Sequence, residues 1–212
     1  MKRLSKIKTI WSTDLAYAVG IITTDGNLSP NNRSINVTSK DLEMINNIKE
    51  CLGISNKIGR KGNGSSEIKR YYVIQFGDVN FYEFLNSIGL TKNKSKTIGE
   101  LKIPDEFFID FLRGCLDGDG NIDVYKHKES NIPQLKLRFC SASIIFLKWI
   151  KQKVKILFKI EGGSIHSNKL YTMHILSYGK TDAGKILKFM YYRNVQRFLN
   201  RKYKIALPFI KE

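Results

Sequence analysis

Two apolar stretches with the same pattern stand out along the chain. Residues 15–26 read LAYAVGIITTDG and residues 111–120 read FLRGCLDGDG, and each is a helix-like apolar run that ends in aspartate followed by glycine. A shift of 94 residues (119 − 25 = 94) places Gly20 on Gly114 and Asp25 on Asp119. The pattern predicts two copies of one buried helix.

The elements around these helices also repeat. Apolar residues at helical or alternating spacing predict helices and strands in the order α-β-β-α-β-β-α, twice, which indicates an internal duplication. In the first half we expect helix 14–25, strand 34–38, helix 41–52, strands 57–61 and 69–76, and helix 78–88. In the second half we expect helix 105–118, strands 120–127 and 134–141, helix 143–158, strands 163–167 and 169–177, and helices 180–192 and 195–204.

The chain therefore divides into two halves. We predict an N-terminal half at residues 1–90, a basic linker at 91–103 and a C-terminal half at 104–212. Each half is too small to be a comfortable domain on its own.

The ends of the two apolar helices are electrostatically unusual. A helix C-terminus carries partial negative charge, so a carboxylate there is disfavoured by roughly 0.3–1 kcal/mol. Small residues four apart, Gly20 with Thr24 and Gly114 with Gly118, lie on one helix face and allow two backbones to approach. We therefore expect these helices to pack together and to bring Asp25 and Asp119 side by side. Two ordinary buried helices with glycine caps are the alternative, and the register between the copies argues against it.

Composition and charge narrow the choice of partner. Hydrophobic residues make up 42% of the chain, and 36 basic against 19 acidic residues give a net charge of +17. Solubility needs a charge of only about 2–8 in a small domain, so the excess indicates a polyanion, most simply nucleic acid. No basic amphipathic helix favours a membrane surface, and no apolar run approaches the ~18 residues of a membrane span.

Cysteine, histidine and loop patterns exclude several other classes. The three cysteines form no C-x-x-C pair and the three histidines are scattered, so we expect no disulfide framework or zinc site. We expect an intracellular, reducing compartment, with cytoplasm, nucleoid and organelle all open. Residues 117–123 resemble the start of a calcium loop, but Ile122 and Lys128 stand where glycine and glutamate are needed.

The chain resembles the LAGLIDADG homing endonucleases in their single-chain form with two motifs. The resemblance lies in the two aspartate-ended helices, the duplicated element order and the lysine-rich end of each half. The resemblance implies an α+β fold of two pseudo-symmetric αββαββα halves, whose four-stranded antiparallel sheets form a DNA-binding saddle around the two helices. It also implies a monomeric, metal-dependent endonuclease that cuts both strands of a long DNA site and leaves short 3′ overhangs.

The same resemblance assigns roles to motif residues. Asp25 and Asp119 would be the catalytic acids and, with Gly26 and Gly120, would hold Mg²⁺, for which Mn²⁺ or Ca²⁺ substitutes. Gly20, Thr24, Gly114 and Gly118 would form the helix interface. Lys94 and Lys202 are candidates for polarising water or the scissile phosphate, with simple phosphate contact or a solvated charge as the alternative. Ser39 and Ser141 stand where the family often has a polar side chain in the water network.

Specificity should come from polar side chains on the sheets. Leu135, Leu137 and Phe139 alternate with Lys136 and Arg138, so these two should face DNA, as should Ser34 and Asn36 in the first half. Further DNA-binding candidates, each individually more suited to phosphate than to bases, are Arg60, Lys61, Lys69, Arg70, Gln75, Lys126, Lys128 and Lys169.

A binding protein of the same fold is the alternative function. Such a protein would be an RNA maturase that acts on its intron or a DNA-binding regulator that no longer cuts. Retention of both Asp25 and Asp119 favours the nuclease, because a pure binder has no need of two carboxylates facing a phosphate backbone.

Overall fold

The computed structural model describes residues 6–62, 70–126, 132–168, 170 and 172–210. It contains two copies of one α/β unit. The first half consists of α1 (Thr13–Asp25), β1 (Gly26–Leu28), β2 (Ser34–Ser39), α2 (Leu42–Leu52), β3 (Ile58–Lys61), β4 (Tyr71–Gly77) and α3 (Val79–Ser87).

The second half repeats this order and adds one helix. A 3-10 turn (Asp105–Phe107) leads into α4 (Phe108–Asp117), β5 (Gly120–Lys126), β6 (Pro133–Ser141), α5 (Ile144–Phe158), β7 (Ser164–Ser167), β8 (His174–Tyr178), α6 (Lys180–Met190) and α7 (Asn200–Ile210).

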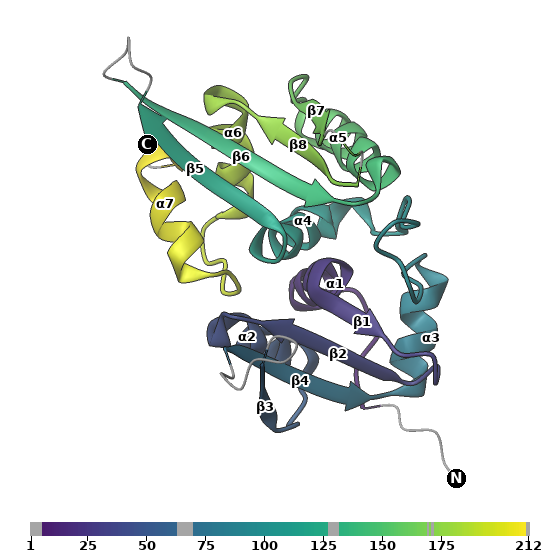
Figure 1. Ribbon diagram of the computed structural model, residues 1–212. Coiled ribbons are helices and arrows are strands. Elements are labelled where there is room, and N and C mark those ends of the chain that lie inside the picture. Colours follow the sequence, from purple (N-terminus) through teal and green to yellow (C-terminus); the bar gives the residue numbers. More distant parts are fainter. Residues whose placement is uncertain (1–5, 63–69, 127–131, 169, 171, 211–212) are drawn as a thin grey trace.

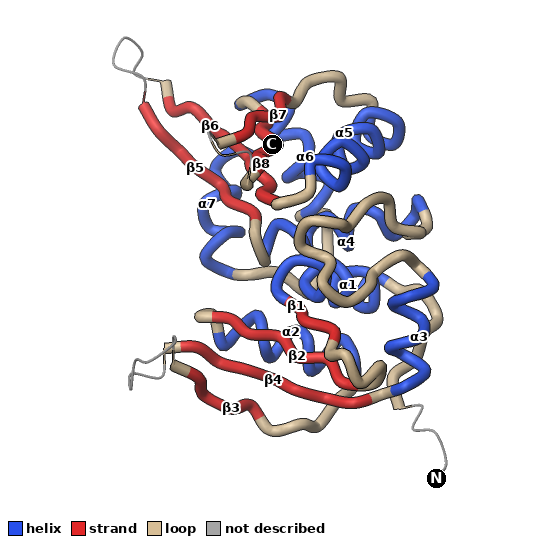
Figure 2. The backbone as a smooth tube through the Cα atoms, turned by 45° about the vertical axis from the view of Figure 1, so that its right-hand side comes forward, coloured by secondary structure: helices blue, strands red, loops and turns tan. Residues whose placement is uncertain are grey.

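Each half builds a four-stranded antiparallel sheet. The strand orders are β1-β2-β4-β3 and β5-β6-β8-β7, so the two sheets have the same topology. Helices α1 and α4 lie between the two sheets (Figures 1 and 2). The predicted α+β fold with two pseudo-symmetric halves is confirmed.

Alternation along the strands separates a core face from a polar face. In β2, Ile35 and Val37 are buried, and their partners on β4, Phe76 and Ile74, are buried too. In β6 the buried residues are Leu135, Leu137 and Phe139. The intervening residues therefore lie on the opposite face of each sheet, as the sequence pattern predicts.

Two elements differ from the sequence prediction. The sequence pattern located no strand before residue 34 in the first half, but Gly26 and Asn27 begin β1, in which Gly26 pairs with Val37. Three residues are too few for an alternating pattern to show. The last helix starts at Asn200 instead of Val195. The backbone N–H of Leu199 donates to the Asp117 carboxylate at 2.9 Å, and the residue before it, Phe198, bonds to the first half.

The segment after the third helix of each half packs against the other half. Residues 91–103 contain no helix or strand, and four of their side chains are buried (Lys94, Ile98, Leu101 and Ile103). The carbonyl of Ile98 accepts a 2.5 Å bond from Ser143 at the start of α5.

Residues 191–201 follow the equivalent path onto α2. The carbonyl of Phe198 accepts from Asn47, and Arg201 pairs with Asp41 at 2.8 Å. The segment predicted as a linker and its counterpart thus form two reciprocal ties between the halves.

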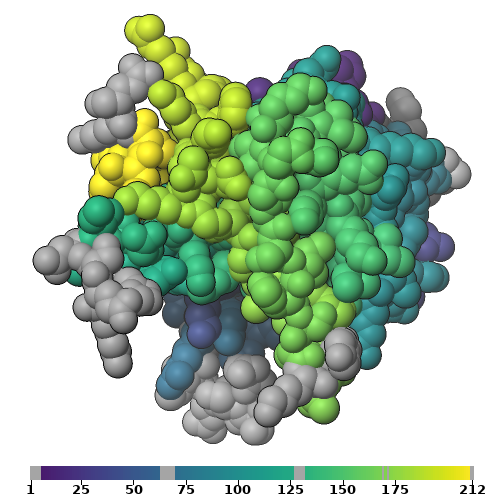
Figure 3. All heavy atoms as spheres, turned by 90° about the horizontal axis from the view of Figure 1, so that it is seen from above, coloured from purple at the N-terminus to yellow at the C-terminus, as the bar shows by residue number. Residues whose placement is uncertain are grey.

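The helices on the outer side of the sheets differ in charge. Figure 3 looks onto the outer end of the second half, where α5 and α6 form much of the surface. The sequences of α5 and α6 carry seven lysines and one acid, whereas those of α2 and α3 carry one lysine and three acids. Among the described helices, none has the length and apolar character that a membrane crossing requires.

Candidate active site

The site begins at the crossing of α1 and α4. A Cβ atom built on Gly20 would lie 2.9 Å from the Cα of Gly114, and one built on Gly114 would lie 3.0 Å from the Cα of Gly20. Each would lie closer still to a backbone carbonyl of the other helix, that of Phe111 or Tyr17. Only glycine allows this approach, so the two backbones are in direct contact where the repeats meet.

A second contact lies one turn further along, next to the aspartates. A Cβ atom on Gly118 would lie 2.8 Å from the Cβ of Thr24 and closer to the Thr24 hydroxyl. Glycine on α4 therefore makes room for threonine on α1. The four residues predicted to form the helix interface are all found at this crossing.

The crossing brings the two motif carboxylates together. Asp25 is the last residue of α1, and its carboxylate touches Gly118. Burial and the negative charge of Asp119 raise the pKa of Asp25 to about 6, against a weaker opposing effect of the Thr24 hydroxyl at 2.9 Å and of Lys202 and Lys94. Asp119 keeps an exposed edge, and its partial burial also raises its pKa. The pair therefore carries repulsion that a cation would relieve.

Two buried lysines lie against the ends of the motif helices. Lys202, on α7, donates to the carbonyls of Leu116, Asp117 (3.0 Å) and Gly120 (2.7 Å). Lys94 donates to the carbonyl of Gly26, which is the counterpart of Gly120. Burial lowers the pKa of each lysine to about 8, although the nearby carboxylates raise it. These ammonium groups supply the positive charge that the electronegative helix ends require.

This arrangement bears on the predicted metal ligands. Gly26 and Gly120 were predicted to help hold the metal, which glycine can do only through its backbone, but the carbonyl of each accepts a hydrogen bond from a lysine ammonium group. The carboxylates of Asp25 and Asp119 accept no such bond from the lysines. The donor set that fits Mg²⁺ is thus the carboxylate pair, because hard oxygen ligands suit this ion. Within the described residues, no group of three His, Cys, Asp or Glu side chains converges, so other oxygens would have to complete the coordination.

Asp117 is buried beside this site but faces away from it. Its carboxylate accepts from the Tyr17 hydroxyl at 2.8 Å and from the backbone N–H of Leu199 at 2.9 Å. Burial raises the pKa of Asp117 to about 6. Asp117 thus joins α1, α4 and the segment before α7.

Ser39 and Ser141 occupy equivalent turns and bond to the backbone. The hydroxyl of Ser39 accepts from the N–H of Asp41 at 3.0 Å, and that of Ser141 accepts from the N–H of Ser143 at the same distance. Both hydroxyls therefore stabilise the turn that leads into a helix. Their suggested place in a water network remains a prediction.

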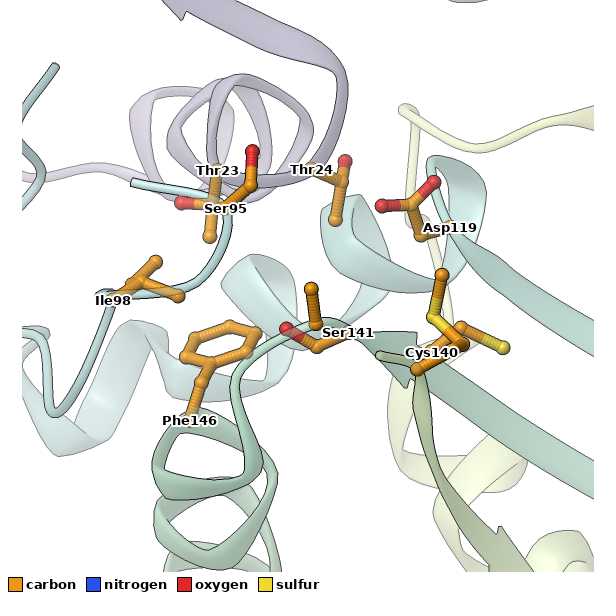
Figure 4. A pocket seen from close by; sticks show the side chains of 10 residues that line it. Thr23, Thr24, Ser95, Ile98, Asp119, Cys140, Ser141 and Phe146 are labelled. Carbon is orange, nitrogen blue, oxygen red and sulfur yellow. The ribbon is translucent and has the colours of Figure 1, made fainter. Parts of the chain in front are cut away.

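A pocket opens beside Asp119. It has a volume of about 250 Å³ and is lined by residues that include Thr23, Thr24, Asp119, Cys140 and Ser141. Figure 4 shows Asp119 and Cys140 on one side of the pocket and Thr24 beside them. Solvent thus reaches the Asp119 carboxylate. The sequence did not single out Cys140, because a lone cysteine at the end of a strand carries no signal.

Known proteins share the fold of this chain. Residues 12–89 match the model of the LAGLIDADG-like domain, which covers the first half only. The structure of the meganuclease I-SmaMI bound to uncleavable DNA aligns with 93% of this chain and 90% of that one, with a TM-score of 0.62 and 15% identity. The first half thus matches a LAGLIDADG-like domain, and the chain as a whole shares the fold of these LAGLIDADG structures. No curated protein sequence matches it.

Two further matches show how widely this LAGLIDADG fold is used. I-DmoI in complex with DNA and Ca covers 92% of this chain and 97% of its own, with a TM-score of 0.60 and 14% identity. The N-terminal LAGLIDADG domain of DUF199/WhiA covers 97% and 99%, with a TM-score of 0.56 and 16% identity. At these identities the likeness establishes the fold, and the fold alone does not distinguish cleavage from binding.

Most of the predicted DNA-binding residues that the structure describes lie on the polar face of the LAGLIDADG sheets. Lys136 and Arg138 alternate with the buried residues of β6, and Ser34 and Asn36 do so on β2. Gln75 pairs with Asn36, and Lys61 pairs with Tyr71, which keeps both on the same face. Arg70 is exposed just before β4.

Two predicted residues lie on the other face. Arg60 pairs with Tyr72 on β4, and its guanidinium stacks over the Tyr72 ring at 4.2 Å on the side of the core. Lys126 shares the face of Ile122 and Val124 on β5. Arg60 and Lys126 therefore do not lie on the polar face, because neighbouring residues of a strand point to opposite faces, and their contact with DNA stays a prediction. Lys69, Lys128 and Lys169 lie outside the described residues.

Proposed function

We propose that this protein is a site-specific endonuclease that binds a long double-stranded DNA site and hydrolyses one phosphodiester in each strand with a divalent metal. The observation that carries the proposal is the carboxylate pair. Asp25 and Asp119 come from equivalent ends of crossing helices, the charge of Asp119 raises the pKa of Asp25, and a pocket opens beside Asp119. Such a pair destabilises a protein that only binds phosphate, but it suits a cation-assisted reaction on DNA.

The residues divide the work of hydrolysis. Asp25 and Asp119 would hold Mg²⁺, which when bound supplies an activated water and neutralises charge on the leaving oxygen. Lys202 and Lys94 hold the helix ends in place and keep positive charge beside the carboxylates, so that phosphate approaches a site that is not wholly acidic. Each half contributes one carboxylate and one lysine, which is consistent with one cut in each strand.

Binding would come from the polar sheet faces and the net charge of +17. Contacts of lysine and arginine with phosphates release counterions, so affinity should fall steeply as salt rises. I-SmaMI and I-DmoI were both crystallised with DNA, which supports double-stranded DNA as the partner here. A monomer suffices, because one chain already contains both halves.

The test is a cleavage assay on the natural locus. The two DNA segments that flank the gene are joined in a plasmid and incubated with the protein and Mg²⁺ or Mn²⁺. We expect one double-strand cut near the junction. Asp25→Asn and Asp119→Asn should abolish it, whereas Glu100→Gln, which makes the same charge change at an exposed site, should cut normally.

A non-cleaving binder is the second candidate, and two observations favour it. The lysines engage the glycine carbonyls at both helix ends, and DUF199/WhiA shares the fold. Specific binding without cutting in either metal would establish that function. Cutting that survives both aspartate substitutions would instead show that the metal lies elsewhere.

A further inference from the structure

The two sheets present matched rows of side chains on their polar faces. In the first half, Asn27, Asn36 and Gln75 pair across β1, β2 and β4. In the second half, Asn121, Arg138 and Ser177 occupy the equivalent register across β5, β6 and β8. The first row is entirely uncharged, whereas the second has an arginine at its centre.

A carboxylate on the same face fixes this arginine. One Nη of Arg138 bonds to Oδ2 of Asp123, two residues along β5 from the strand position that faces Arg138. The other carboxylate oxygen, Oδ1, accepts from the Asn121 side chain at 2.7 Å. Lys136 lies directly opposite Asp123, but its ammonium is placed over the Tyr125 ring at 5.2 Å. Both oxygens of Asp123 are thus used to hold neighbours on the polar face.

An acid is out of place on a surface that only binds phosphates. Asp123 would repel the DNA backbone and cancel the charge of Arg138, and both side chains remain about one-third exposed, at 35% and 31%. Exposed ion pairs add little stability, so folding alone does not account for the pair. The benefit of a fixed guanidinium is directional, since its remaining N–H groups point in a defined way.

This geometry matches one base pair in the major groove. Guanine presents two acceptors, O6 and N7, which arginine binds with two parallel N–H groups, and the paired cytosine presents an N4 amine, which a carboxylate accepts. We propose that Asp123 and Arg138 act together as a reader of a single G·C pair, with Arg138 on guanine and Asp123 both orienting Arg138 and accepting from cytosine. The inference rests on the proposed function, because it assumes that the polar faces bind duplex DNA.

The distance from the site gives the position of this base pair. Asp123 is four residues beyond Asp119, so it lies about 13 Å along an extended strand. Base pairs are spaced at about 3.4 Å, which places the G·C pair within roughly four base pairs of the phosphate nearest Asp119. The uncharged first-half row, with its three amides, should instead favour adenine at the mirrored position.

The experiment is a binding selection that does not need cleavage. The full chain is incubated in Ca²⁺ with a library of duplexes that carry the joined natural locus with every position near the junction randomised in turn, and bound DNA is sequenced. Wild-type protein should enrich G·C at one position on the side of the junction that the second half of the protein contacts. Arg138→Ala should lose that preference by about 5- to 150-fold and leave the other positions unchanged.

Two further variants separate reading from simple charge. Asp123→Ala keeps the arginine but frees it, so affinity for random DNA should rise while the preference for G·C falls. Asn36→Ala, at the equivalent first-half position, should change base preference only on the side of the junction that the first half contacts. Thermal unfolding of each variant shows whether the sheet stays intact.

The outcomes are distinct. If wild type enriches a sequence but Arg138→Ala keeps its G·C preference, or if Asp123→Ala binds all DNA more tightly without losing discrimination, the reader assignment is overturned and the nuclease proposal stands. If wild type enriches no sequence at all, both fall together.

Discussion

The two halves share a backbone but differ in the side chains that they present to solvent. At the helix crossing the two halves are nearly equivalent. Gly20 and Gly114 make the same backbone contact, and the carbonyls of Gly26 and Gly120 each accept a hydrogen bond from a lysine. On the polar faces they differ, with amides in one row and an arginine–aspartate pair in the other. Positions constrained by backbone packing have stayed alike, while positions free to contact a partner have diverged. The two polar faces therefore present different chemistry on the same backbone frame.

The strongest test of equivalence is at the crossing. Gly20→Ala and Gly114→Ala should each destabilise by at least about 3 kcal/mol, because the new methyl group meets a backbone carbonyl that cannot move alone. Gly184→Ala in α6 is the control, since its methyl group would have only an ordinary 3.7 Å neighbour and should stabilise by about 0.5–1 kcal/mol. Urea unfolding measures all three. Unequal losses of stability in Gly20→Ala and Gly114→Ala would show that the two helices are not equivalent at the crossing.

The lysines should show a graded difference between the halves. Lys202 donates to three carbonyls and Lys94 to one, so Lys202→Met should reduce the free energy of unfolding by about 2–3 kcal/mol and Lys94→Met by about 1 kcal/mol. Lys148→Met, at an exposed position on α5, should have no effect. Equal losses at Lys94 and Lys202 would mean that burial, and not the number of carbonyl bonds, sets the contribution.

The carboxylates should show the opposite sign. The pKa of Asp25 in the folded protein is about 6, above its ordinary value of 3.8, so the ionised form destabilises the metal-free fold at pH 8 and this penalty disappears as the pH falls from about 6 to 4. Asp25→Asn should therefore raise the unfolding free energy by about 1–2 kcal/mol at pH 8 and leave it unchanged at pH 4.

Asp119→Asn should follow the same trend with a smaller gain, because Asp119 is more exposed. Thermal melts in a chelator at both pH values measure these differences. If Asp25→Asn instead lowered the stability at pH 8, the ionised Asp25 carboxylate would be making a net favourable contribution to the fold.

The smallest effects should come from the exposed ion pairs. Arg201 pairs with Asp41 across the halves, whereas Lys153 pairs with Asp105 inside the second half, and both pairs are partly exposed. Arg201→Ala and Lys153→Ala should each change stability by less than about 1 kcal/mol, with sensitivity to salt. A much larger loss in either variant would indicate that its segment detaches as a unit.

The sequence predicted what repeats and what alternates. The paired helices, the αββαββα order and the buried faces of β2 and β6 follow from apolar spacing, which acts locally. It did not locate the three-residue β1, the start of α7 at Asn200 or the face on which Arg60 lies. These depend on pairing partners distant in the chain, such as Val37 for Gly26 and Asp117 for Leu199.

Only the part of the candidate site that forms a repeated motif could be predicted from the sequence. The aspartates and glycines were visible as a repeated motif. The carbonyl bonds of Lys202, the turn bonds of Ser39 and Ser141, and the pairing of Asp123 with Arg138 appear only once the elements are folded. Contacts of this kind join residues that carry no common spacing in the sequence.

The late position of Lys202 has a consequence for synthesis. Its bonds to the end of α4 span 82 to 86 residues, and the tie between Arg201 and Asp41 spans 160. Contacts so distant in the chain form slowly and cannot form before residue 202 has left the ribosome. A nascent chain that has completed the first half and both motif helices still lacks the cation that holds the end of α4. Assembly of the end of α4, beside Asp119, is thereby delayed until translation has passed residue 202.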